Sequence, residues 1–111
     1  MSEKSLDEMT IVEMLDFALS NTKHALGLIL EKIEDGEGVV ADEIQVPMDH
    51  LTGAKNLDKA GRWREAGGHA QRAMKECHAL SNKFRAIAFR ELNEARRAAS
   101  LAAGLLAEKA Y

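Results

Sequence analysis

The chain has 111 residues and a mass of 12.2 kDa, which is enough for one domain around one hydrophobic core. Hydrophobic residues make up 46% and charged residues 30%, which excludes a disordered chain, and no apolar run approaches the roughly 18 residues of a membrane-spanning helix. The net charge of -3 is unevenly divided, because residues 1–50 carry twelve acidic side chains against three lysines, whereas residues 51–111 carry twelve basic side chains against six acidic ones.

The first predicted element is a helix over residues 6–34. Ser5 and Glu8 have the spacing of a capping box, and Asp35-Gly36 is a plausible stop. Ser20-Asn21 offers an alternative break within the helix. Apolar and small residues recur at alternating three- and four-residue steps, which is typical of one helical face: Val12, Leu15, Leu19, Thr22, Leu26, Ile29 and Ile33.

Residues 35–46 are predicted to form a loop that leads into a second helix. Pro47 disfavours helical backbone at Val46 and suits the first turn of a helix, so we expect this helix to begin at Pro47. It should end near Ala60, with Gly61 as the stop. The alternative is an end near Glu65, before the paired glycines 67 and 68.

Residues 64–108 keep a helical seam over about five heptads, which predicts a long C-terminal helix. An unbroken helix would be about 68 Å long at 1.5 Å per residue, too long for a compact chain of this size. Either a break near Ser81-Asn82 gives four helices or the protein is elongated. The predicted seam positions are Ala70, Met74, Cys77, Ser81, Phe84, Ala88, Glu91, Ala95, Ala98, Ala102 and Leu105.

These elements predict a single all-α domain over residues 1–111, an antiparallel bundle of three or four helices with a long C-terminal helix. Fifteen of the 18 alanines follow residue 50, so the long helix should pack closely but gain little apolar area per contact. Oligomerisation commonly recovers such area, and we therefore expect a homodimer. The opposed charges of the two halves should serve pairing between helices or subunits, with the basic stripe of the long helix setting antiparallel register against the acidic first helix.

The segment Gly61-Arg62-Trp63-Arg64-Glu65-Ala66-Gly67-Gly68-His69-Ala70 resembles the start of the second helix of a tetratricopeptide repeat. The resemblance covers residues 47–88, with His50 where tryptophan is usual, and implies a helical hairpin. The same hairpin also resembles that of HEPN domains. That resemblance implies a ribonuclease motif of Arg72 and His78, although the family places this motif after the hairpin.

A metal site is an alternative reading of the polar side chains. Glu65 and His69 lie four residues apart, and His24 and Glu31 on the first helix could complete a site in a bundle. Further candidates are His50, Cys77 and His78. No Cys-x-x-Cys or repeated Glu-x-x-His pattern occurs, so we favour no metal or other cofactor and expect Cys77 to be a small buried hydrophobe.

Trp63 is either a staple of the hairpin or a partner-binding anchor, since tryptophan is enriched at interface hot spots. The long helix is basic, and its stripe would serve an acidic partner, nucleic acid or a solvated face. We favour the last over nucleic acid, because few aromatic side chains stand near the stripe. The candidate partner-binding residues are Trp63, Arg85, Arg90, Arg96 and Arg97.

No phosphate-binding glycine loop, catalytic triad or paired-carboxylate constellation is present, so we expect no enzyme. The single cysteine and the lack of an apolar leader predict a cytoplasmic protein with no membrane partner. The function most consistent with the residues is a non-enzymatic protein–protein interaction or assembly module, an adaptor or regulatory helical bundle.

Overall fold

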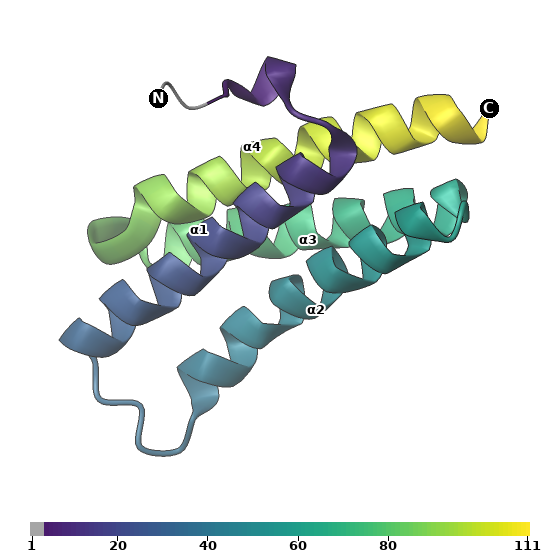
Figure 1. Cartoon of the computed structure of the whole chain (residues 1–111). Coiled ribbons are helices and arrows are strands. Elements are labelled where there is room, and N and C mark those ends of the chain that lie inside the picture. Colours follow the sequence, from purple (N-terminus) through teal and green to yellow (C-terminus); the bar gives the residue numbers. More distant parts are fainter. Residues whose placement is uncertain (1–3) are drawn as a thin grey trace.

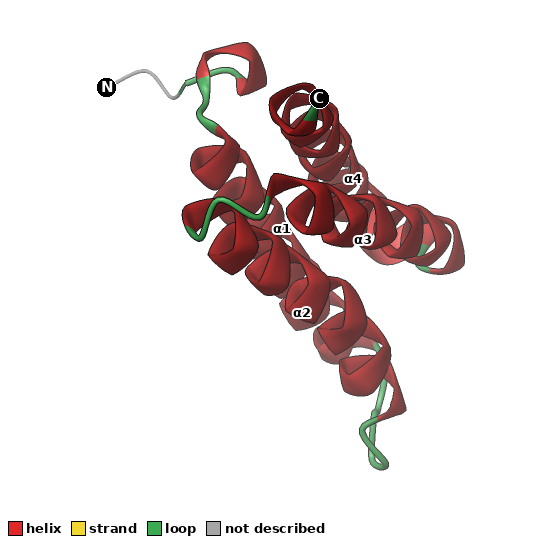
Figure 2. Ribbon diagram, turned by 90° about the vertical axis from the view of Figure 1, so that its right-hand side faces the viewer, coloured by secondary structure: helices red, strands yellow, loops and turns green. Residues whose placement is uncertain are grey.

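A computed structural model describes residues 4–111 (Figure 1). A short 3-10 helix, η1 (Leu6–Glu8), precedes four helices, α1 (Ile11–Lys32), α2 (Val39–Lys59), α3 (Trp63–Lys83) and α4 (Arg85–Ala110). Each helix packs against the next along the chain, and α4 returns to pack against α1 (Figure 1). All elements in this part of the chain are helices joined by loops (Figure 2). The predicted all-α bundle is therefore confirmed, in its four-helix form.

The first helix begins later than predicted, at Ile11. Thr10 caps it, because its side chain accepts a hydrogen bond from the Glu13 backbone N–H while the Glu13 carboxylate accepts one from the Thr10 N–H. This capping box replaces the predicted one at Ser5 and Glu8, which instead frame η1. Both pairs have the same spacing, so the pattern alone did not distinguish a helix start from a single tight turn.

The predicted loop over residues 35–46 is wrong beyond Gly38, because α2 begins at Val39 and Pro47 lies inside it. The Asp35 carboxylate accepts hydrogen bonds from the backbone N–H groups of Val40 and Ala41, at 2.9 and 3.0 Å. These bonds satisfy donors that the first turn of a helix leaves unpaired. Two further helical turns therefore form before the proline, and the wholly buried Ile44 secures them against the core.

The long C-terminal helix is divided, as the four-helix alternative required, but at Phe84 rather than at Ser81-Asn82. Phe84 has non-helical backbone angles and is buried beside Leu80, Ala88 and Leu92. No glycine or proline stands at this turn, and Phe84 packs into the core where the chain reverses. The chain folds back on itself, with a radius of gyration of 13.8 Å, close to the ~13 Å expected of a compact domain of about 100 residues.

The core draws residues from all four helices, and small side chains dominate where α3 crosses α4. A Cβ added at Gly67 would lie 3.6 Å from the Leu106 Cβ, which shows how closely the two helices approach. The predicted seam is largely buried, as alanine at these positions requires. One seam position is wrong: Leu105 is exposed, and the neighbouring Leu106 fills the core in its place.

Two ion pairs join the acidic first half of the chain to the basic second half. Lys55 Nζ lies 2.8 Å from the Asp16 carboxylate, linking α2 to α1, and Lys83 Nζ lies 2.7 Å from Glu43, linking α3 to α2. Part of the charge asymmetry is thus used between helices of one chain. None of the helices described here is long and apolar enough to span a membrane.

Candidate interaction surface

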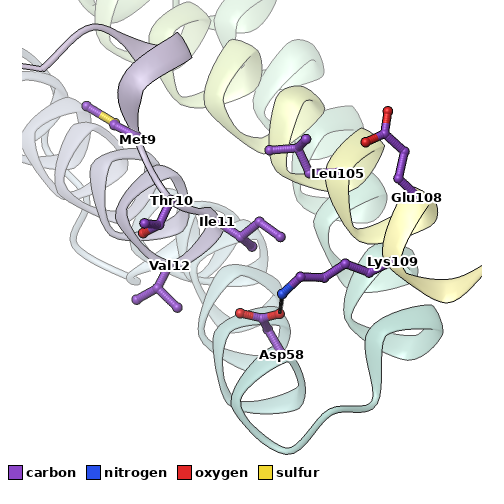
Figure 3. A pocket seen from close by; sticks show the side chains of 8 residues that line it. All are labelled: Met9, Thr10, Ile11, Val12, Asp58, Leu105, Glu108 and Lys109. Carbon is purple, nitrogen blue, oxygen red and sulfur yellow. Dashed lines mark hydrogen bonds and ion pairs between the residues drawn. The ribbon is translucent and has the colours of Figure 1, made fainter.

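A hollowed apolar surface lies between the start of α1 and the end of α4. One hollow, with a volume of about 510 Å³, has Ile11 and Val12 on one wall and Leu105 on the other (Figure 3). A second hollow of about 330 Å³ shares Leu105 and continues toward Met14, Leu101 and Gly104. We refer to the two together as the α1–α4 groove, formed by Met9, Ile11, Val12, Met14, Leu101, Gly104 and Leu105.

Two leucines of α4 make this groove unusual for a surface. Leu101 is 41% and Leu105 is 36% exposed, and they stand one helical turn apart on the same side of α4. Single exposed leucines are common in soluble proteins, whereas neighbouring ones beside a hollow are typical of a surface that binds another molecule. The groove is therefore a candidate interaction surface in the described part of the chain.

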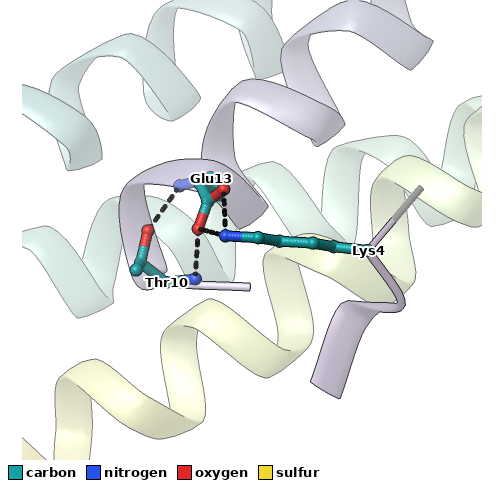
Figure 4. Close-up of polar contacts among 3 residues, drawn as sticks. All are labelled: Lys4, Thr10 and Glu13. Carbon is teal, nitrogen blue, oxygen red and sulfur yellow. Dashed lines mark hydrogen bonds and ion pairs between the residues drawn. The ribbon is translucent and has the colours of Figure 1, made fainter. Parts of the chain in front are cut away.

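The N-terminal segment is held beside the groove by the same capping carboxylate that starts α1. Lys4 Nζ donates to Glu13 at 3.0 and 3.2 Å, so that Glu13 bonds both the Thr10 N–H and the lysine (Figure 4). The Thr10 backbone and then Lys4 lower the pKa of Glu13 below its ordinary value. This contact brings η1 across the α1–α4 boundary, where Asp7 lines the second hollow.

Charged side chains stand at the rim of the groove. Lys109 Nζ lies 3.4 Å from Asp58 at the end of α2, while the exposed Glu108 borders both hollows (Figure 3). An apolar floor with a charged rim is the usual anatomy of a protein-binding surface.

Trp63, a predicted partner-binding residue, is the first residue of α3 and is 38% exposed. The ammonium of Lys109 lies 5.3 Å from the centre of its ring, within range of a cation–π contact. The same lysine lines the first hollow of the groove, so Trp63 stands at the same end of the bundle. Its exposed ring borders the candidate surface without lining it.

The four predicted arginines of α4 make local contacts. The Arg85 guanidinium lies 4.9 Å from the centre of the Phe89 ring, and the other three contact side chains of α4 itself: Arg90 with Glu91, Arg96 with Asn93, and Arg97 with Glu94. Within residues 4–111 none of them forms an ion pair with α1. No ion pair of this basic stripe therefore sets the register of α4 against the acidic first helix within residues 4–111.

The side chains of the alternative metal site are not brought together. His24 and Glu31 are exposed on α1, and Glu65 forms an ion pair with Arg62. His69 instead faces α2, where its Nδ1 atom lies 2.9 Å from that of His50. No group of three or more potential ligands gathers anywhere in residues 4–111. The sequence placed His69 on the correct helix but did not reveal which neighbour it would face.

The residues of the HEPN-like motif also remain apart. Arg72 and His78 are exposed on α3, and six residues of helix separate them by roughly 120° around its axis. Cys77 between them is wholly buried, as predicted, beside the Thr22 hydroxyl. Burial raises the pKa of its thiol to about 11, so the thiolate that nucleophilic chemistry requires is scarce at neutral pH.

No protein-family model, curated protein or solved structure matches the chain.

Proposed function

We propose that this protein is a non-enzymatic protein–protein interaction or assembly module that acts through the α1–α4 groove. The observation that carries the proposal is the exposure of Leu101 and Leu105 beside two continuous hollows. The chain leaves these leucines partly in water although the neighbouring Leu106 is wholly buried in the core. A partner that covers them would remove their exposed area from water and stabilise both surfaces.

The shape of the groove suits a helical partner. It runs between two helices and has apolar side chains on both walls, the nearly buried Ile11 and Met14 on α1 and the exposed leucines on α4. A helix that docks in such a groove places apolar anchors at three- and four-residue steps.

A photoreactive benzophenone side chain at position 105 tests the proposal. After irradiation in cell extract, we expect a covalent adduct with a defined polypeptide, either a second copy of the chain or another protein. A probe at the exposed Gln71, on α3, is the matched control and should give no such adduct. The adduct should disappear when Leu101 is replaced by serine in the same chain, and the purified partner should bind the Leu101→Ser variant more weakly.

Adducts of equal yield at positions 105 and 71, or adducts that persist in the Leu101→Ser variant, would contradict the proposal. Circular dichroism of each variant shows whether the bundle remains folded. Since both leucines are exposed, these substitutions should leave the helix content unchanged.

A further inference from the structure

Four exposed residues form a line along the outer face of α4: Arg97, Leu101, Gly104 and Glu108. Their 4-3-4 spacing places them on one helical face, as in the seam of a coiled coil. The inward-facing seam of α4 runs beside this line and contains alanines. The outer line is thus a second face of the same helix. Leu101, Gly104 and Glu108 line the α1–α4 groove, whereas Arg97 lines a neighbouring hollow beside the N-terminal segment.

Residues at equal distances from the middle of this line have complementary charge or size. A basic residue at one end matches an acidic residue at the other, and a large apolar residue matches a glycine. Both pairs share one midpoint, between residues 102 and 103. Ser100 and Leu105 share the same midpoint and again match a small residue with a large one. A helix with this arrangement is complementary to an antiparallel copy of itself.

We propose that the groove binds a second copy of this chain, with the two α4 helices antiparallel about a two-fold axis that passes between residues 102 and 103. Arg97 then faces the partner's Glu108, and Leu101 packs over the partner's Gly104. Each contact occurs twice, as the symmetry of such a dimer requires. The inference rests on the proposed function, because it names the occupant of the same surface.

Space and charge both support this occupant. A Cβ built at Gly104 would meet nothing within 4 Å, so the helix has a flat position at which a leucine of the other copy can rest. Glu108 forms no ion pair within residues 4–111. The pair of Arg97 with Glu94 lies in solvent, where such pairs contribute little, so the guanidinium can turn toward a second carboxylate.

The contact should be weak, because it joins one helix and its flanks rather than a whole face of the bundle. Interfaces below the standard size of about 1,600 Å² commonly bind in the micromolar range. Sedimentation equilibrium of the full-length purified chain, from about 1 to 500 μM and at low salt, covers that range. We expect a monomer–dimer equilibrium there, with weaker association at high salt.

Charge reversal tests the proposed register. Arg97→Glu or Glu108→Arg alone places like charges opposite each other twice per dimer, and each should raise the dissociation constant about tenfold or more. The double variant Arg97→Glu/Glu108→Arg restores opposite charges and should recover most of the affinity. Arg72→Glu, on the exposed side of α3, is the control and should leave the dissociation constant unchanged.

The possible outcomes separate this inference from the proposed function. A monomer throughout the concentration range, with a different protein attached to the probe at position 105, overturns the inference alone. A dimer that is insensitive to both single reversals, or is not rescued by the double variant, overturns the antiparallel α4 arrangement. The absence of any adduct at position 105 overturns the proposed function itself.

Discussion

The Nδ1 atoms of His50 on α2 and His69 on α3 lie 2.9 Å apart, and their ring centroids are separated by 5.2 Å. At this distance one ring donates an N–H to the other, which must accept through an unprotonated nitrogen. The contact joins two helices through imidazole rings, whose ordinary pKa lies nearer neutral pH than that of the other charged side chains. Only one of the two facing Nδ1 atoms can carry a proton while this hydrogen bond is present. Protonation of both rings therefore breaks the contact.

We therefore predict that the bundle loses stability as pH falls below about 6.5. Burial, followed by the nearby His69 and Arg72, lowers the pKa of His50, whereas Glu76 and Asp49 oppose the shift. These groups come from α2 and α3. The folded state binds the proton less well than the unfolded chain does. The free energy of unfolding should therefore be highest above pH 6.5, the pKa of the histidine in the unfolded chain. It should decline as pH falls toward the lowered folded value.

Urea unfolding at pH 7.5 and 5.5 measures this loss. In the His50→Asn variant, which cannot take up the proton, the difference between the two pH values should shrink. The control is His24→Asn, at an exposed position on α1 away from the ring pair. A His50→Asn protein with the same pH dependence as the wild type would show that this contact does not couple protonation to stability.

Cys77 should resist thiol reagents in the native protein. Its side chain is wholly buried in the core, and a pKa of about 11 leaves about one thiolate in a thousand at pH 8. We expect Ellman's reagent to react with Cys77 only at the rate at which the bundle opens, and to react fully in 6 M guanidinium chloride. Rapid stoichiometric labelling of the folded protein would contradict the packing of α3 described above.

The start of α2 should depend on Asp35. Backbone N–H groups of Val40 and then Ala41 lower the pKa of this carboxyl below its ordinary 3.8. The stabilisation it gives is present above pH 3.8 and should be lost as pH falls through the lowered folded value. Asp35→Ala should increase amide hydrogen exchange at residues 39–46, measured at neutral pH.

Asp42→Ala is the matched control for this cap. Asp42 also lies in the first turn of α2, so its loss removes a favourable charge near the helix N-terminus but no capping bond. It should alter exchange at residues 39–46 less than Asp35→Ala does. Equal effects of the two variants would mean that charge, and not the hydrogen bonds, maintains the first two turns.

Two glycines should respond oppositely to replacement by alanine. Gly27 lies within α1, and an added Cβ would meet nothing within 4 Å, so Gly27→Ala should stabilise the fold by about 0.5–1 kcal/mol. Gly61, in the turn before α3, has a φ of 76°, which an alanine side chain disfavours. Gly61→Ala should therefore destabilise the protein. Thermal unfolding of both variants measures the two signs, and a gain from Gly61→Ala would contradict the turn geometry.

Much of the helical content could be predicted from the sequence, because hydrophobic periodicity and local propensity act over neighbouring residues. The seam from Ala70 to Ala102 was identified in this way and is largely buried. The boundaries were less predictable. Ser5-Glu8 and Thr10-Glu13 have equivalent spacing, and only the structure shows that Thr10 is the cap of α1. Pro47 favoured a helix start, but the Asp35 cap and the buried Ile44 extend α2 before it.

The candidate surface was the least predictable feature, since it depends on which of two adjacent leucine positions faces inward. The sequence placed Leu105 in the seam, because the 4-3 spacing that Ala95, Ala98 and Ala102 follow continues to it, yet Leu106 is the buried residue. By itself the sequence determined an all-α, alanine-rich bundle, because propensity and period are local properties. Only the tertiary structure decided the chain reversal at Phe84, the burial of Leu106 in place of Leu105, and the meeting of His50 with His69, because each depends on how helices distant in sequence pack together.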